Sequence, residues 1–163
     1  MSSASGVKIL DTVIEDYQKL QKDQTLKYII FSIKAHNGKD YSAIDVHCKS
    51  EEKKRSKEED ISEQETLFEE FTEHLREAEK ANECRYGLFD FCCRDSAGHP
   101  RQGIVFIAWS PENAKTKEKM VYASSRDALQ KKFDGVKVII QATDYDEIDK
   151  DVVEKELVRK LYS

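Results

Sequence analysis

The apolar residues near the start of the chain follow helical spacing and then change to strand spacing. Positions three and four apart predict a first amphipathic helix, with Asp11 as its cap. Its apolar stripe consists of Leu10, Val13, Ile14, Tyr17 and Leu20. Residues 28–33 carry apolar side chains on both faces, which is typical of an interior strand.

A second strand is predicted after a turn at Asn37 and Gly38. Between residues 43 and 48 the pattern alternates, so that one face of the strand is apolar and the other is partly polar. The apolar face holds Ile44, Val46 and Cys48, and the other holds Ala43, Asp45 and His47. One solvated face indicates a position at the edge of a sheet.

The middle of the chain predicts a loop, a helix and a hairpin. Residues 51–60 contain no apolar side chain and predict a solvated loop. Residues 62–65 have the form of a capping box, which would open a second amphipathic helix. Its apolar positions are Leu67, Phe68, Phe71, Leu75 and Ala78. Residues 85–93 and 104–109 are apolar strands joined by a hairpin loop at 95–100.

The last third of the chain predicts a helix, a strand and a final helix. Residues 110–129 run without a breaker after Ser110, a suitable cap, and Pro111, a suitable first helical residue. A short strand at 136–140 follows, and then a helix capped by Asp149, with Ile148 placed to pack against Val153. The buried stripe of this helix is Val153, Leu157 and Leu161. Hairpins joined by helices predict a single α/β domain with a mixed sheet covered on both faces.

Composition narrows the function. The 163 residues suffice for one domain with a real core, and a net charge of −5 disfavours a general nucleic-acid binder. No apolar stretch is long enough to cross a bilayer, and the N-terminus lacks an apolar signal region. We therefore expect a cytoplasmic protein with reduced thiols.

Candidate catalytic chemistry is sparse. The sequence has no phosphate-cradling Gly-Lys motif, metalloprotease motif or nucleophile elbow. Cys92, Cys93 and His99 could in principle form a thiol site or meet around zinc, but adjacent strand residues point to opposite faces and do not converge. We expect no enzyme activity, no cofactor and no metal, and we keep a small thiol enzyme as the rival from another class.

Two segments carry a family resemblance. Residues 110–129 place lysines at 115, 117 and 119 before Met-Val-Tyr-Ala-Ser-Ser, and residues 4–7 read Ala-Ser-Gly-Val. Together they resemble the long actin-binding helix and the N-terminal signature of the actin-depolymerising factor/cofilin family. The resemblance implies the ADF-homology fold, a five-stranded mixed sheet flanked by four main helices, over residues 7–163 after a flexible tail at 1–6.

The resemblance also implies a function. It implies a monomeric actin-binding protein of the cytoskeleton that binds actin monomers and filament sides and promotes filament severing and depolymerisation. The nearest alternative is a coactosin-like or glia-maturation-factor-like protein, which binds filaments or branch complexes without depolymerising them. The intact Ser-Gly-Val and Lys-x-Lys-Met elements favour the first of these.

The monomer site implied by the resemblance joins the N-terminal signature to the long helix. It comprises Ser5, Gly6, Val7, Lys117, Lys119, Met120 and Ser124. Ser5 would also be the regulatory phosphorylation site. Residues two apart on a helix point about 200° apart, so Lys117 and Lys119 must straddle a cleft or lie on a distorted helix start. Periodicity alone does not settle whether Met120 or Tyr122 is buried; the resemblance places Met120 on the actin surface and Tyr122 inside.

The filament site implied by the resemblance is formed by Arg101, Glu154, Lys155 and Arg159. Gly103 stands where the family often has a second basic residue.

Two further expectations concern basic residues. Lys117, Lys119, Lys131 and Lys132 supply a local positive field that predicts inhibitory phosphoinositide binding at a membrane surface. The basic residues at 53–55 leave nuclear entry open, although their acidic neighbours favour a solvated loop.

Overall fold

The computed structural model describes residues 6–161, and Ser5 lies outside them. The elements follow in the order β1 (Lys8–Ile9), α1 (Asp11–Gln21), β2 (Tyr28–His36), β3 (Lys39–Lys49), α2 (Lys57–Lys80), β4 (Arg85–Arg94), β5 (Pro100–Trp109), α3 (Thr116–Gln130), β6 (Val136–Ala142), a 3₁₀ turn η1 (Tyr145–Ile148) and α4 (Lys150–Leu161). No helix among them is long and apolar enough to span a membrane.

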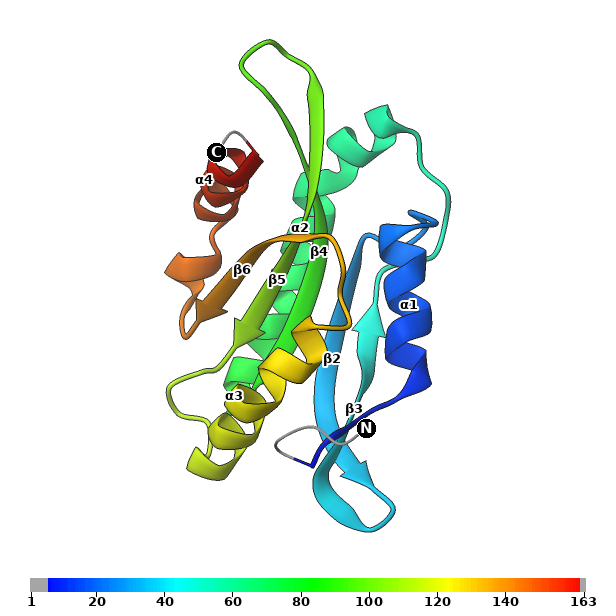
Figure 1. The fold of residues 1–163 in the computed structure, drawn as a ribbon. Helices are drawn as coiled ribbons and strands as arrows, with labels where there is room; N and C mark the ends of the chain where they lie inside the picture. Colours follow the sequence, from blue (N-terminus) through cyan, green and yellow to red (C-terminus); the bar gives the residue numbers. More distant parts are fainter. Residues whose placement is uncertain (1–5, 162–163) are drawn as a thin grey trace.

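One mixed sheet forms the centre of the molecule (Figure 1). Its strand order is β1-β3-β2-β4-β5-β6, with parallel pairing only at the two ends, β1 with β3 and β5 with β6. Helices α1 and α3 pack against one face of the sheet, and α2 and α4 pack against the other. The predicted single α/β domain, with four helices covering both faces, is confirmed.

The sheet has six strands rather than five. The additional strand is β1, where Lys8 and Ile9 pair in parallel with Ala43 and Ile44. Two residues are too few to carry a period-two pattern, so the sequence gives no sign of this strand. It covers only part of the outer edge of β3.

Three helices begin at other residues than predicted. The N-cap of α1 is Leu10, so Asp11 is the first helical residue. Helix α2 starts at Lys57, and its capping box pairs Ser56 with Glu59, one helical turn or more before the predicted box. Helix α3 starts at Thr116, because residues 111–114 form a separate turn closed by a bond from the Ala114 N–H to the Pro111 carbonyl. The starts of α2 and α3 lie before the first apolar positions of their helices, where the pattern gives no signal.

The start of α4 was predicted correctly. The carboxylate of Asp149 accepts a hydrogen bond from the backbone N–H of Asp151 at 3.2 Å. Ile148 and Val153 flank this cap, and both are buried in the same apolar cluster.

Strand β3 contains a bulge that the alternation does not reveal. Ile30 pairs with Cys48 but Phe31 pairs with Val46, so His47 is an extra residue in β3. The bulge turns Cys48 toward the α2 side, whereas Ile44 and Val46 pack on the α1 side. The prediction that these three side chains share one face is therefore wrong.

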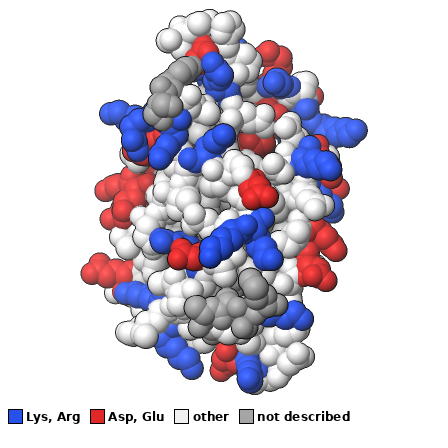
Figure 2. Space-filling model, in the orientation of Figure 1, with Lys and Arg blue, Asp and Glu red and all other residues white. Residues whose placement is uncertain are grey.

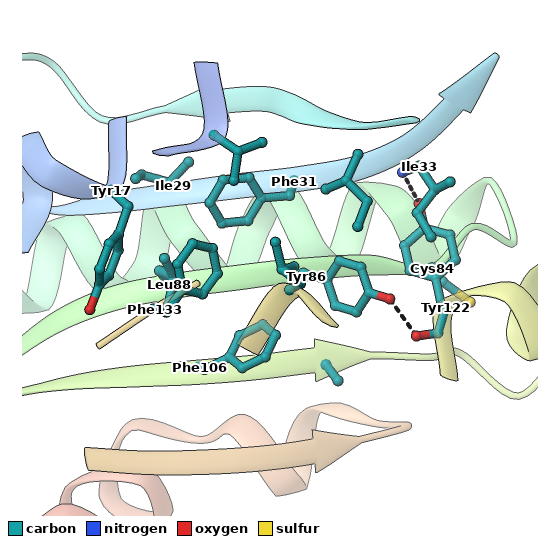
Figure 3. Packing of buried hydrophobic residues seen from close by; sticks show 14 of the residues in the cluster. Tyr17, Ile29, Phe31, Ile33, Cys84, Tyr86, Leu88, Phe106, Tyr122 and Phe133 are labelled. Atoms are coloured by element: carbon teal, nitrogen blue, oxygen red, sulfur yellow. Dashed lines mark hydrogen bonds between the residues drawn. The ribbon is translucent and has the colours of Figure 1, made fainter. Parts of the chain in front are cut away.

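Phe133, which follows α3, joins the two helices of one face to the sheet (Figure 3). Its ring centre lies 4.6 Å from that of Tyr17 in α1, 5.5 Å from that of Phe31 in β2 and 5.9 Å from that of Phe106 in β5. Aromatic contacts of this kind add to the free energy of burial. They fix the C-terminal end of α3 over the sheet.

Tyr122 fixes the middle of α3 over a gap in the sheet. Strands β2 and β4 pair only from Tyr28 to Phe31, which leaves the N–H of Ile33 without a strand partner on that side. The Tyr122 hydroxyl accepts this N–H at 2.8 Å, and the Tyr86 hydroxyl donates to the Tyr122 carbonyl (Figure 3). One residue of α3 thus bridges β2 and β4 where they separate.

We predict that Tyr122→Phe lowers the free energy of unfolding by about 1–3 kcal/mol, because the buried N–H of Ile33 loses its acceptor. Urea unfolding followed by circular dichroism measures this, and the slope against urea should stay unchanged. An unchanged midpoint would show that the Ile33 N–H is satisfied without the hydroxyl.

Candidate functional site

Helix α3 has one face buried against the sheet and one face exposed to solvent. Glu118, Tyr122, Ser125 and Leu129 are buried, at spacings of four, three and four residues. On the outer side Lys117 and Ser124 are exposed, and Met120 is 65% exposed. The expectation that Met120 faces out and Tyr122 faces in is confirmed. We call Lys117, Met120 and Ser124 the α3 ridge.

Lys117 and Lys119 lie on opposite flanks of the regular helix start. The Lys117 ammonium is 5.9 Å from the centre of the Tyr41 ring in β3. The Lys119 ammonium donates to the carbonyl of Glu112, in the turn before the helix. Of the two arrangements that the sequence allows, the structure has the one in which the lysines point to either side of the helix.

A buried carboxylate holds the helix start in place. Glu118 is only 8% exposed, and it accepts the backbone N–H of Cys84 at 2.7 Å. Cys84 immediately precedes β4, so this bond ties the first turn of α3 to the sheet. The buried side of the first turn is thus fixed while Lys117 and Met120 project outward.

The N-terminal part of the predicted monomer site is only partly described. Val7 is buried, at 4% exposure, in the apolar cluster beneath α1 and α3. Gly6 before it is exposed and has a φ of +76°, a left-handed conformation that suits glycine. The chain therefore enters the core at Val7, and Ser5 stands two residues before this buried position.

The predicted filament residues gather at the start of β5 and on α4. Arg101 is exposed, and its guanidinium lies 3.3 Å from the carboxylate of Asp95 in the β4–β5 hairpin. Arg101 and Glu154 both act electrostatically on the thiol of Cys93, which places the two charges in one neighbourhood. Arg159 pairs at 2.8 Å with Glu156 on its own helix.

Gly103 has a packing role between these charges. A Cβ atom at this position would lie 2.4 Å from a methyl group of Leu157 in α4. The glycine therefore lets α4 approach β5 closely. A larger residue at this position would require the Leu157 side chain to shift.

The two groups of predicted actin residues lie far apart. The start of α3 and the N-terminal segment are at one end of the molecule, and α4 and the β4–β5 hairpin are at the other (Figure 1).

The four lysines of the predicted phosphoinositide site are also divided. Lys131 and Lys132 are exposed at the C-terminal end of α3, about 21 Å along the axis from Lys117. On the face shown in Figure 2, positive and negative side chains are interspersed.

Cys92, Cys93 and His99 do not come together. The Cys92 sulfur accepts a hydrogen bond from the Lys27 ammonium at 3.2 Å, and Cys93 packs on the α2 side of the sheet. Burial raises the pKa of both thiols above the ordinary value, which disfavours the nucleophilic thiolate. The side chain of His99 is 75% exposed in the hairpin, beside Asp95. Across residues 6–161 no three His, Cys, Asp or Glu side chains are grouped to hold a metal ion.

Lys53 and Arg55 are held against α2, whereas Lys54 between them is exposed. The guanidinium of Arg55 and the ammonium of Lys53 approach Glu63 at 3.1 and 3.3 Å, and the Arg55 side chain is only 3% exposed.

Sequence reasoning missed two residues of this site. The buried stripe of α3 begins at Glu118, four residues before Tyr122, so its spacing could have indicated an inward position. Tyr41 lies far from α3 in the chain and no local pattern marks it. Its contact with Lys117 arises only from the packing of β3 beside α3.

Comparisons of the sequence with known proteins all point to one family. The model of the family described as cofilin/tropomyosin-type actin-binding proteins matches residues 6–158. Actin-depolymerizing factor 3 of Arabidopsis thaliana is 35% identical over 93% of this chain and 94% of its own. Cofilin of Mycosarcoma maydis is 33% identical over 98% of this chain and 99% of its own.

Solved structures agree with the sequence comparisons. Streptomyces griseoflavus cofilin superposes with a TM-score of 0.73 at 32% identity, over 94% of this chain and 98% of that one. Coactosin of Entamoeba histolytica has a TM-score of 0.69 at 14% identity, over 98% and 99% of the two chains, which shows a shared fold only. The fold, the family match and the relatives together show that this chain belongs to the actin-depolymerising factor/cofilin family of actin-binding proteins.

Proposed function

We propose that this protein binds actin monomers and the sides of actin filaments and promotes filament severing and depolymerisation. The observation that carries the proposal is the α3 ridge, which presents a lysine, an exposed methionine and a serine on one helix face. The names of the two relatives above, an actin-depolymerizing factor and a cofilin, support the same activity.

The ridge has the chemistry of a groove-binding element. Methionine is flexible and polarisable, so Met120 can adapt to an irregular apolar groove on the partner. The positive charge of Lys117 beside it favours acidic residues at the rim of that groove. The helix start is held from behind by Glu118, which reduces the ordering cost on binding.

Filament binding needs a second surface, because the side of a filament offers more than one subunit. We propose Arg101, Glu154, Lys155 and Arg159 for this role. They lie at the end of the molecule opposite the α3 ridge, so both surfaces can be occupied at once (Figure 1). Preferential binding to a differently twisted filament state would shift the filament population toward that state and promote severing without any chemical step.

The alternative is a coactosin-like or glia-maturation-factor-like protein that binds filaments or branch complexes without disassembling them. Loss of polymer after dilution of fluorescent filaments, measured together with co-sedimentation, separates the two. Filament binding with no increase in the disassembly rate would favour the alternative.

We further propose that phosphoinositides at a membrane surface compete with actin, because Lys117 and Lys119 would serve both ligands. The Lys131–Lys132 pair would engage a separate headgroup, since it lies about 21 Å away along α3. We place the protein at the cytoskeleton in the cytoplasm and expect it to act as a monomer.

We predict that the double variant Lys117→Ala with Lys119→Ala binds monomeric actin several-fold or more weakly, because close interface charges contribute about 1–3 kcal/mol. The matched control is Lys131→Ala with Lys132→Ala, which makes the same charge change at the other end of α3. It should bind monomers normally. Equal losses in the two variants would contradict a site at the helix start.

The same two variants test the lipid proposal with phosphatidylinositol bisphosphate vesicles. Each lysine near an anionic surface contributes about 1 kcal/mol, so each pair should weaken vesicle binding by about ten-fold or more. Vesicles should displace monomeric actin from the unaltered protein. Co-sedimentation that neither variant weakens would exclude these lysines as the lipid site.

We predict that Ser5→Glu weakens monomer binding by about ten-fold relative to Ser5→Ala, a difference of about 1.4 kcal/mol. The added charge would face an acidic partner surface, and a phosphate would add about −1.5 to −2 charge at the same place. Melting temperatures should agree between the variants, because both substitutions lie before Val7, the first buried residue that the structure describes. Equal affinities would exclude Ser5 as the switch, and a parallel fall in melting temperature would make it a structural residue.

A further inference from the structure

Tyr41 holds a backbone conformation that its side chain disfavours. Its φ is +51°, in the left-handed region where the Cβ of a bulky residue is crowded. Of the non-glycine residues with positive φ within residues 6–161, the other three are Gln24, Asn37 and Asn82. Tyr41 is the one aromatic residue among them. Such outliers persist where surrounding contacts hold them, and they gather at functional sites.

The positive φ falls where the pairing of β2 with β3 is irregular, between the pairs Lys34–Ala43 and His36–Lys39. The side chain of Tyr41 contacts the start of α3. The ring packs partly buried against the edge of the apolar cluster beneath α1 and α3. The Lys117 ammonium lies over it, 5.9 Å from the ring centre, a cation–π distance. Tyr41 thus connects strand β3 directly to the α3 ridge.

The hydroxyl of Tyr41 reaches the next residue of the same helix. Burial raises the pKa of this hydroxyl above its ordinary value, and the charge of Glu118 and a hydrogen bond to it raise the pKa further. Glu118 in turn accepts the Cys84 N–H, so its orientation is fixed from two sides. The ring and the hydroxyl therefore engage two consecutive residues, Lys117 on the outer face and Glu118 on the inner face.

Asp40 and Glu83 also place negative charge near Tyr41. Like Glu118, they raise the pKa of the Tyr41 hydroxyl. A lysine ammonium over an aromatic face is held more firmly than one on an open helix surface.

We propose that Tyr41 is a positioning residue for actin-monomer binding, because its ring holds the Lys117 ammonium on the α3 ridge in the orientation that the partner meets. This inference rests on the proposed function of the ridge. Holding a long side chain in advance removes an ordering cost on binding that corresponds to about two- to ten-fold in affinity.

The test is a double-mutant cycle between Tyr41 and Lys117. The dissociation constant for monomeric actin is measured for Tyr41→Leu, Tyr41→Phe, Lys117→Ala and the combination of Tyr41→Leu with Lys117→Ala. We expect Tyr41→Leu to bind about three-fold more weakly or worse, and Tyr41→Phe, which keeps the ring, to stay within about two-fold of the unaltered protein. In the Lys117→Ala background, Tyr41→Leu should cause no further loss of actin affinity. If Tyr41 had only a structural role, the substitution would weaken binding in both backgrounds.

Three outcomes would overturn the proposal: normal affinity of Tyr41→Leu, a loss that persists when Lys117 is alanine, or an equal loss in Tyr41→Phe. If Tyr41→Leu fails to fold, Tyr41→Gly replaces it, because glycine accepts the positive φ without strain. Normal binding by Lys117→Ala alone would refute the proposed role of the ridge. A loss in Lys117→Ala with none in Tyr41→Leu would refute only the role of Tyr41.

Discussion

The arrangement of the molecule depends on how α3 is seated over the gap between β2 and β4. These strands separate beyond Phe31, and an open gap would leave the buried Ile33 N–H without an acceptor. Tyr122 satisfies that group with its hydroxyl and accepts the Tyr86 hydroxyl with its carbonyl. Because buried polar groups are costly when unpaired, this geometry fixes both the depth and the rotation of α3. The rotation in turn decides that Met120 and Lys117 face outward.

On the opposite face of the sheet, α2 and α4 pack closely because two strand positions are glycines. A Cβ atom at Gly87 would lie 2.6 Å from the Phe71 ring of α2, and one at Gly103 would lie 2.4 Å from Leu157 of α4. Side chains of the two helices thus fill the places that glycines leave on the strands. One face is held by specific hydrogen bonds to tyrosines, and the other by close contact at glycines. The sheet between them is a rigid support for surfaces at both of its ends.

This rigidity suits a member of an actin-binding family. The buried Glu118 and Val7 fix the elements beneath the start of α3, while the exposed groups around it are long and flexible. A firm base limits the ordering cost of binding to the side chains themselves. On the face shown in Figure 2, positive and negative side chains are interspersed, so this face has no large patch of one sign.

The sequence by itself determined the order of the helices and strands, the hairpins, the cap of α4 at Asp149 and, through residues 4–7 and 110–129, the family. Residues 28–33 and the stripe of α1 could be assigned because burial of a face leaves a period in the chain. The common face of Lys117, Met120 and Ser124 follows from helix geometry in the same way. These features depend only on residues that are neighbours in sequence.

Tertiary structure alone decided the short strand β1, the bulge at His47 and the hydrogen bond from the Ile33 N–H to the Tyr122 hydroxyl. It also decided the contact of Tyr41 with Lys117. Each of these depends on a partner distant in the chain, such as Ala43 for β1 or Ile33 for Tyr122. A local pattern indicates whether a position is buried, but it does not indicate which distant residue will contact it. Hydrogen bonds and close contacts depend on that distant residue.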